Sequence, residues 1–396
     1  MSFSTLGLSE PILKAVAEIG YTQPTNIQKR AIPVILSKKD LIAAAQTGTG
    51  KTASFVLPIL ERLNTGYRLR GKRIKALILT PTRELAVQVE ASIAQYSKHL
   101  ELTSMAMYGG IDAEPQKQRL IWGVDIIVAT PGRLLDMAHQ RALHFDELEV
   151  LVLDEADRML DMGFREDINK IIERLPSERQ NLLFSATLSD EIRSLAKRAI
   201  SSNAVEISIK QDEKSKPKIE QWLVTVDKTN KSALLSHLIK ENTWQQALIF
   251  IETKHGAAKL VSQLEKRDIK AECIHSGKTQ EIRERILADF KAGKIQFLVA
   301  TAVAARGIDI DNLDRVINYD LPDRPDDYIH RIGRTGRAGA SGEAISFVAK
   351  DNFRNLCAIE SKLGHIIERK EFEEFPVKKV VPVSILNFVP KNKQHS

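Results

Sequence analysis

The feature that most constrains the fold is an alternation of short apolar runs with amphipathic stretches along the 396 residues. The apolar runs mostly lack alternating polar residues, which is typical of strands buried on both faces. Strands that alternate with helices indicate an α/β chain built on parallel, doubly wound sheets. The expected strands are 41–44, 76–80, 125–130, 150–154, 181–186, 221–226, 247–251, 295–300, 315–319 and 343–348, and the clearest helices are 53–62, 83–100, 166–175 and 282–291.

One polar segment, I-S-I-K-Q-D-E-K-S-K-P, divides this pattern and ends in proline, as a linker does. We therefore expect a first domain over 1–206, a linker over 207–217, a second domain over 218–370 and a basic tail over 371–396. Eleven extended residues span about 35 Å, enough for two domains to open and close. The halves could be distant structural repeats, although no residue-level periodicity relates them. A solvated tail is the default, and an accessory RNA-binding or partner-docking tail is the alternative.

A net charge of +7 favours an anionic partner but does not require nucleic acid. Cys273 and Cys357 lie in apolar segments without metal-ligand spacing, which indicates inert thiols in a reducing compartment. The N-terminus lacks the basic and apolar regions of a signal peptide, and no apolar run is long enough to cross a membrane. We expect a cytoplasmic protein with no membrane partner.

A glycine-rich stretch at 45–52, A-Q-T-G-T-G-K-T, lies between an expected strand and an expected helix, the context of a phosphate-binding loop. Gly48 and Gly50 lack a Cβ, so backbone N–H groups can approach a phosphate. The helix beginning near Lys51 adds its positive end. Lys51 would reach the β- and γ-phosphates, and the Thr52 hydroxyl would bind Mg²⁺. The alternative is a glycine-rich turn that happens to precede a lysine.

An acidic quartet, D-E-A-D, ends the apolar run 150–154. Adjacent carboxylates are poor core residues because burying unpaired charge is costly. With a phosphate-binding loop in the same sheet, Asp154 would hold Mg²⁺ largely through water, and Glu155 would orient or deprotonate the attacking water. Alone, such a quartet is usually a solvated loop. Nearly every polar cluster follows directly on an apolar run, and ligands of doubly wound sheets bind beyond these carboxyl ends.

Further motifs occur in a fixed order. The first half carries G-Y-T-Q-P-T-N-I-Q, P-T-R-E-L, G-G, T-P-G-R and S-A-T, and the second carries A-T-A-V-A-A-R-G-I-D and H-R-I-G-R-T-G-R. Together with the glycine-rich loop and the acidic quartet, these motifs resemble those of the DEAD-box RNA helicases over residues 3 to about 350. The finer details of the sequence most resemble the bacterial RhlE branch. The resemblance implies two tandem RecA-like domains, each a mostly parallel sheet flanked by helices, with an ATP/RNA cleft between them.

The resemblance implies an ATP site shared by both domains. Gln28 offers a donor and an acceptor that suit the adenine edge, and Tyr21 offers a ring face, although a half-buried core aromatic is the alternative for Tyr21. Asp309 would accept a ribose hydroxyl. The implied ATP-binding residues are Phe3, Tyr21, Gln28, Gln46, Thr47, Gly48, Thr49, Gly50, Lys51, Thr52, Gly307, Asp309, Arg334 and Arg337; the catalytic ones are Lys51, Asp154, Glu155, Arg334 and Arg337, and Thr52 and Asp154 would hold Mg²⁺.

Three arginines within 330–337 cannot all be core residues and must face solvent, an anion or a carboxylate. The resemblance implies that Arg334 and Arg337 reach the γ-phosphate, a contact worth about a thousandfold in rate. His330 would link the phosphate site to the S-A-T motif, and Arg331 would make polar contacts within the site. A lone histidine there is more often structural.

The S-A-T motif follows the expected strand 181–186. By resemblance, Ser185 and Thr187 couple hydrolysis to strand separation by bonding Asp157 and nearby groups. A hydroxyl pair that caps the following helix is the competing interpretation.

Turns at helix starts present N–H groups, hydroxyls and guanidinium groups to backbone phosphates. The resemblance assigns such positions to RNA, through sugar and phosphate contacts that are independent of base sequence. A surface helix cap is the alternative for Arg83. The implied RNA-binding residues are Pro81, Thr82, Arg83, Gly110, Thr130, Arg133, Thr253, Gly277, Gln280, Arg283 and Thr301.

Two positions depart from the family pattern: Ala302 stands where aspartate is usual, and Ser276 separates the usual H-G pair. ATP binding depends on neither, so we expect an ATP- and Mg²⁺-dependent RNA helicase. It would locally unwind short RNA duplexes or remodel RNA–protein complexes in ribosome assembly or RNA decay, with ribosomal or degradation proteins reached through the tail. The absence of this aspartate keeps open the alternative of an ATP-dependent RNA clamp or annealing factor with weak unwinding. A DNA helicase, distinguished by 2′-hydroxyl contacts, and an ATPase with a protein client are further alternatives.

Overall fold

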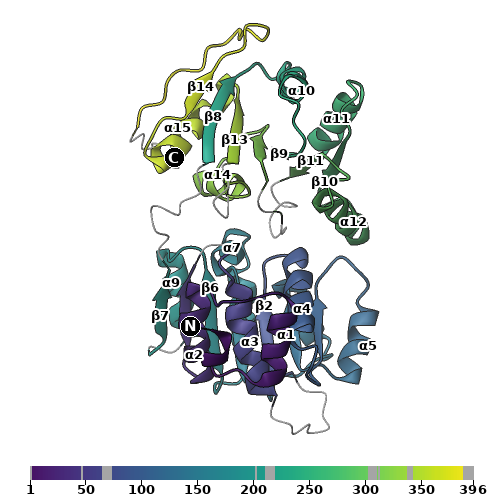
Figure 1. The fold of residues 1–396 in the computed structure, drawn as a ribbon, viewed down its shortest axis with the longest axis vertical. Coiled ribbons are helices and arrows are strands. Elements are labelled where there is room, and N and C mark those ends of the chain that lie inside the picture. The colour runs from purple at the N-terminus through teal and green to yellow at the C-terminus, as the bar shows by residue number, and fades with distance from the viewer. Residues whose placement is uncertain are drawn as a thin grey trace, which may run out of the picture. The chain divides into compact units, whose positions relative to one another are not determined.

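The computed structural model describes residues 2–45, 48–64, 74–200, 203–209, 219–301, 310, 313–336 and 342–386. The chain forms two compact units, Met1–Gln211 and Asp212–Ser396, each with its own sheet (Figure 1). Within the ranges given, no helix is both long and apolar enough to cross a lipid bilayer.

The first unit contains a seven-stranded parallel sheet in the order β3-β4-β2-β5-β6-β1-β7. Its central strands are uniformly buried, as the apolar runs predict. The strands are β1 (Leu41–Ala44), β2 (Ala76–Leu79), β3 (Ser104–Met107), β4 (Ile126–Ala129), β5 (Val150–Leu153), β6 (Gln180–Ser185) and β7 (Val205–Ser208).

Helices cover both faces of this sheet, because successive strand residues point to opposite sides. In β4, Ile126 packs with one helix layer and Ile127 with the other. The first layer, in front in Figure 1, is α1 (Glu10–Glu18), α2 (Asn26–Leu36), α3 (Lys51–Leu63) and α4 (Arg83–Tyr96), preceded by the short η1 (Phe3–Thr5). The second is α6 (Pro131–His139), α7 (Ala156–Asp161), α8 (Arg165–Ile172) and α9 (Asp190–Ala199), with α5 (Glu114–Trp122) at its margin.

The second unit repeats this architecture, with the order β10-β11-β9-β12-β13-β8-β14. The strands are β8 (Ile219–Thr225), β9 (Ala247–Ile251), β10 (Ala271–Ile274), β11 (Phe297–Thr301), β12 (Arg315–Asn318), β13 (Gly342–Val348) and β14 (Glu368–Lys370). One face is covered by α10 (Lys231–Glu241) and α11 (Lys254–Glu265), and the other by α12 (Gln280–Lys291), α14 (Pro325–Ile332) and α15 (Phe353–Leu363), which follows the short η3 (Lys350–Asn352).

The two sheets have the same topology. If the strands of each unit are numbered from its first strand, both orders read 3-4-2-5-6-1-7, since each number of the second sheet exceeds its counterpart by seven. The expected α/β class with parallel sheets is therefore confirmed, and the halves are structural repeats despite the absence of a residue-level repeat.

The expected linker begins too early. It was expected to begin at residue 207, but Ile207 is buried in β7 and pairs with Ala43, so the strand continues to Ser208. The described part of the expected tail is mostly exposed, as expected of a solvated segment. A few of its apolar side chains nevertheless pack on the second unit: Phe372 and Phe375 contact His237 of α10, and Val381 is buried.

Candidate nucleotide and RNA sites

The phosphate-binding loop follows β1, and its glycines are required by their backbone conformation. Gly48 and Gly50 have φ angles of +79° and +86°, which side chains rarely adopt. A Cβ on Gly50 would also lie 2.5 Å from Nε2 of Gln28. Lys51 begins α3 and is 7% exposed, and its Nζ has no hydrogen-bond partner among the described residues. A buried, unpartnered ammonium is costly, so this site is suited to an anion. Gln46 and Thr47 lie outside the described residues.

Gln28 ties the start of α2 to this loop. Its Oε1 accepts a hydrogen bond of 2.9 Å from the Thr25 backbone N–H, and its Nε2 donates one of 3.2 Å to the Gly50 carbonyl. The side chain is only 3% exposed. One donor and one acceptor of the amide are therefore used internally, and one of each remains for the adenine edge predicted from the sequence.

Three aromatic side chains, Phe3, Tyr21 and Tyr96, lie next to one another in the first unit. Tyr21 stacks on Phe3 with ring centroids 6.4 Å apart, and its hydroxyl lies 3.3 Å from that of Tyr96 in α4. Tyr21 is 41% exposed, whereas Phe3 is 5% exposed. Tyr21 is therefore not a core residue and can present a ring face, while Phe3 supports it from within. Tyr96 was not singled out from the sequence, because an aromatic on the apolar face of a helix is usually core.

The acidic quartet is not a solvated loop. Asp154, directly after β5, is 3% exposed, and burial raises its pKa to about 7, against the opposing charge of Lys51. Its Oδ1 accepts a 3.0 Å hydrogen bond from the Glu155 N–H. Glu155 has a φ of +50°, uncommon for a residue with a side chain, and its carboxylate pairs with Arg158 at 2.6 Å. Arg158 is a second residue that the sequence did not single out.

The D-E-A-D and S-A-T motifs are in contact. Asp157 Oδ2 accepts hydrogen bonds from the Ala186 N–H at 3.0 Å, from the Thr187 N–H at 3.2 Å and from the Thr187 hydroxyl at 3.4 Å. Ser185 does not bond Asp157 in the contacts observed; its Oγ accepts from the Thr187 N–H. The capping alternative fails, because Ser189 caps α9.

The first unit's predicted RNA residues converge after β2, β3 and β4. Thr82, and not Arg83, caps α4 by accepting from the Leu85 N–H. The Arg83 guanidinium lies against Gly110, where a Cβ would come within 2.2 Å of it. Arg133 donates to the Ile111 carbonyl at 2.9 Å, and its Nη1 has no partner within the described part of the chain. Pro81 precedes α4 and Thr130 is the N-cap of α6.

The order of the strands therefore places the nucleotide motifs and the RNA motifs in two separate groups along the edge formed by the carboxyl ends of the strands. The loops after β5, β6 and β1, which are neighbours, carry the nucleotide motifs, and those after β3, β4 and β2 carry the RNA motifs. All lie at carboxyl ends of parallel strands, where such sheets bind ligands.

The second unit shows the same division. Its predicted RNA residues Thr253, Gly277 and Thr301 follow or end β9, β10 and β11, the counterparts of β2, β3 and β4. Gln280 and Arg283, at the start of α12, are only 4% and 6% exposed. The predicted RNA residues Thr82, Thr130 and Thr301 are similarly buried, at 7%, 9% and 8%, so low exposure is shared by these positions and does not separate their roles.

The arginine motif begins in α14. Arg331 is 7% exposed and donates to the Asp320 carbonyl at 2.8 Å and to Asn318 Oδ1 at 3.3 Å, so it makes the internal polar contacts that were predicted. His330 is exposed and Arg334 half-buried. Ala302, Gly307, Asp309 and Arg337 lie outside the described residues.

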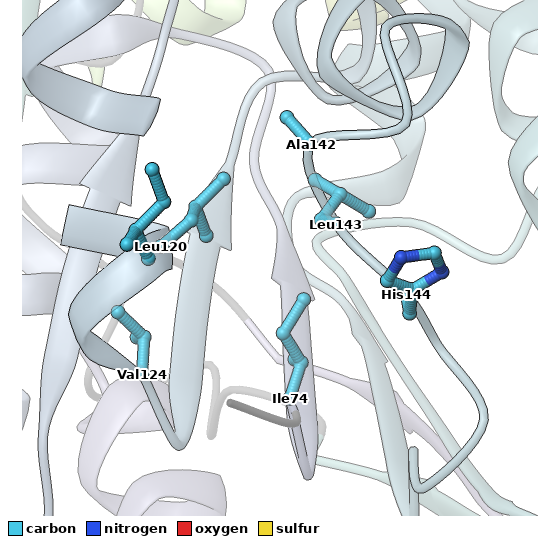
Figure 2. Close-up of a pocket in the computed structure, with 7 residues that line it drawn as sticks. Ile74, Leu120, Val124, Ala142, Leu143 and His144 are labelled. Atoms are coloured by element: carbon cyan, nitrogen blue, oxygen red, sulfur yellow. The ribbon is translucent and has the colours of Figure 1, made fainter. Parts of the chain in front are cut away.

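A cavity elsewhere in the first unit is not the site. It measures about 190 Å³ and is lined mostly by apolar side chains (Figure 2): Ile74, Leu120, Ile121, Val124, Ala142, Leu143 and His144. Ile74 and Val124 precede β2 and β4, so the cavity lies at the amino ends of these strands, opposite the motifs.

Family models match most of both units. One, described as DEAD/DEAH box helicase, matches residues 25–195, and another, described as helicase conserved C-terminal domain, matches residues 230–339.

The chain belongs to the DEAD-box RNA helicase family.

Relatives with established names agree with this membership. RNA helicase CrhR of Synechocystis is 42% identical over 93% of this chain and 74% of its own length, and RhlB of Pseudomonas syringae is 41% identical over 92% and 93%. The solved structure of Saccharomyces cerevisiae Dbp5 bound to RNA and ADP BeF3 has a TM-score of 0.82 and 34% identity, covering 94% of this chain and 96% of that one. The chain is thus an ATP-dependent RNA helicase with two tandem RecA-like domains. The relatives carry several branch names, so the RhlE branch stays a prediction.

The residues of this DEAD-box helicase fit a magnesium–nucleotide complex. Among the positions described, no group of three or more His, Cys, Asp or Glu side chains is placed to hold a metal. Mg²⁺ needs no such cage, because it binds through one or two protein oxygens, water and substrate phosphates. The buried carboxylate of Asp154, the Thr52 hydroxyl at the start of α3 and the unpartnered Lys51 Nζ supply that chemistry.

Proposed function

We propose that this DEAD-box helicase hydrolyses ATP in an RNA-stimulated manner and locally unwinds short RNA duplexes or remodels RNA–protein complexes. One observation carries the proposal. A single edge of the first sheet holds the Lys51 ammonium, which has no hydrogen-bond partner among the described residues, and the carboxylate of Asp154, together with the loops that carry the Arg83 and Arg133 guanidinium groups.

For hydrolysis, Lys51 and the N-terminus of α3 bind the phosphates, and Thr52 and Asp154 hold Mg²⁺, which neutralises phosphate charge when bound. Glu155 orients or deprotonates the attacking water, and its ion pair with Arg158 supports a fixed carboxylate direction. Arg334 and Arg337 supply positive charge to the γ-phosphate when the domains close, as the family implies.

Adenine is recognised by Gln28 and stacked by Tyr21. The remaining donor and acceptor of Gln28 match one base edge, and its hydrogen bond to the Gly50 carbonyl connects base recognition to the phosphate loop. The exposed Tyr21 ring offers the stacking surface.

RNA is held through its backbone. Arg133 retains an unpartnered Nη1 within the described residues, and Thr82, Thr130 and Gly110 lie at helix starts or turns. Such groups contact phosphate and sugar and carry no base sequence information. Closure of the two domains would bend one strand so that a short duplex cannot stay paired, and hydrolysis with phosphate loss would reopen them.

The cellular task proposed is ribosome assembly or RNA decay in the cytoplasm, with protein partners reached through the C-terminal tail. Residues 387–396 of the tail lie outside the described structure. In the described part, the exposed apolar side chains of Val380, Val383 and Ile385 would offer contacts to a partner.

The test is a panel of RNA duplexes of graded length, each with and without ATP, scored for hydrolysis and for strand displacement. The proposal expects both, with displacement lost as duplex length grows. Hydrolysis without displacement would instead support an RNA clamp, the alternative that Ala302 leaves open. DNA of equal length serves as control, since equal stimulation by DNA would contradict 2′-hydroxyl recognition.

A further inference from the structure

The second domain contains a partly buried ion pair at the position that corresponds to the proposed phosphate site of the first domain, with the Lys231 side chain 5% exposed and the Asp320 side chain 27% exposed. Because the sheets share one topology, α10 corresponds to α3, and the loop after β12 corresponds to the loop after β5. Lys231 is the first residue of α10, as Lys51 is of α3, and both are buried. Asp320 follows β12 by two residues, and Asp154 follows β5 by one.

The two lysines differ in what they bind. Lys51 Nζ has no partner in the described structure, whereas Lys231 Nζ donates to Asp320 Oδ1 at 2.9 Å and to the Tyr319 carbonyl at 2.6 Å. The loop before α10, V-D-K-T-N, contains no glycine and cannot form a phosphate cradle. In the second domain, the Asp320 carboxylate therefore occupies the position that corresponds to the proposed phosphate site of the first domain.

Asp320 also joins two functional segments of its domain. Its Oδ2 accepts a 3.1 Å hydrogen bond from the Glu252 N–H, next to Thr253, the N-cap of α11. Its carbonyl accepts the 2.8 Å hydrogen bond from Arg331, on the helix that leads to Arg334. The Arg331 guanidinium in turn lies 5.0 Å from the ring centre of Phe250, in the strand that precedes Glu252.

We propose that Lys231 and Asp320 are positioning residues that couple RNA binding at Thr253 to the placement of Arg334 for ATP hydrolysis. The proposal rests on the roles of Thr253 and Arg334 in the proposed function. Both carboxylate oxygens of Asp320 accept hydrogen bonds, one from Lys231 and one from the Glu252 N–H, so the pair has few alternative arrangements. A shift of the Glu252–Thr253 backbone therefore moves Asp320, and with it the hydrogen bond that holds Arg331.

The experiment measures RNA stimulation, the ratio of kcat for ATP hydrolysis with saturating single-stranded RNA to kcat without RNA. Lys231→Met should lower this ratio about tenfold, within the usual range of coupling between sites. The control is Arg315→Met, which breaks the ion pair of Arg315 with Glu343 (2.7 Å) at the other end of β12. It should lower the thermal unfolding midpoint as well but leave the ratio unchanged.

Lys231→Met leaves the partly buried Asp320 carboxylate without its cation, which also lowers the stability of the domain. The double variant Lys231→Met with Asp320→Asn removes both charges and keeps similar side-chain volumes, and the same loss of stimulation is expected of it. Parent-like stimulation in either Lys231 variant would overturn the inference, as would an equal loss in Arg315→Met. A parent protein that RNA does not stimulate would overturn the proposed function and this inference with it.

Discussion

At the scale of single residues, the site contains groups whose burial or backbone conformation costs folding free energy when no ligand is bound. Lys51 is buried with an ammonium that has no partner in the described structure, Asp154 is buried beside it, and Glu155 adopts a left-handed conformation. Each cost is tolerated where function needs a preorganised group. These residues therefore carry the sharpest predictions.

Glu155→Gln should bind ATP and RNA normally but hydrolyse ATP at least about a hundredfold more slowly, because the amide cannot accept a proton from water. Single-turnover hydrolysis together with equilibrium binding of nucleotide and RNA measures this. Glu166→Gln, at an exposed position in the first turn of α8, is the control. Parent-like turnover in Glu155→Gln would refute the role of this carboxylate.

The raised pKa of Asp154 predicts a pH-dependent stability. Burial raises this pKa to about 7, above its usual value near 4, so the folded state binds a proton that the unfolded state has lost between these values. The contribution of Asp154 to stability is thus fully present below about pH 4 and is lost as the pH rises towards 7.

Asp154→Asn removes this titration. In the nucleotide-free protein, the unfolding midpoint of the variant relative to the parent should therefore rise between pH 5 and pH 8, by an amount worth up to a few kcal/mol. Thermal unfolding at several pH values measures the difference. A difference that is independent of pH would show that Asp154 ionises normally.

At the scale of elements, the sequence predicts central strands well and edge strands poorly. The strands that the apolar runs missed, β3, β7, β10 and β14, are the edges of the two sheets. An edge strand has one open side and can carry polar residues, as E-R-K in β14, V-E-I-S in β7 and A-E-C-I in β10 show, so a continuous apolar run need not mark it. The edge strand β3, S-M-A-M, is mostly apolar but only four residues long. The same reasoning explains the linker error, since β7 is such an edge.

The motif residues were predictable because their chemistry requires particular residue types. The residues that hold the motif side chains in place were not predictable. Tyr96 contacts Tyr21 across 75 residues, which only the fold brings about, whereas Arg158 pairs with Glu155 at a local i,i+3 spacing that is common on helices and marks no function. Lys231 and Asp320 become visible only when the two sheets are aligned by topology.

The contact between Gly110 and Arg83 joins two elements of the RNA site. Gly110→Ala should displace the guanidinium and strain a φ of +82°, lowering RNA affinity about tenfold, equivalent to one hydrogen bond to a charged group. The matched control is Gly109→Ala, whose Cβ would meet no atom within 4 Å. RNA titrations of both variants decide the point. Equal affinities would mean that Arg83 does not need this contact.

At the scale of the whole molecule, backbone recognition predicts salt-dependent RNA binding. Affinity should fall linearly with salt on logarithmic axes, and Arg133→Ala should reduce the slope by about one while weakening binding to all RNA sequences alike. Lys170→Ala, on the exposed face of α8, is the control and should leave the slope unchanged. A salt-insensitive complex would contradict the proposed RNA site.

The sheet order also determines when the first domain can fold during synthesis. β1, which leads into the phosphate loop, pairs on one side with β6, so Leu41 meets its partner Leu182 only after 141 more residues have been made. At ordinary translation rates this delay is on the order of ten seconds. Until then the apolar segment L-I-A-A has no strand neighbours in its sheet and is open to chaperones or to misplaced pairing. β1, the strand that leads into the phosphate-binding loop, is thus synthesised early but pairs with its sheet neighbours late.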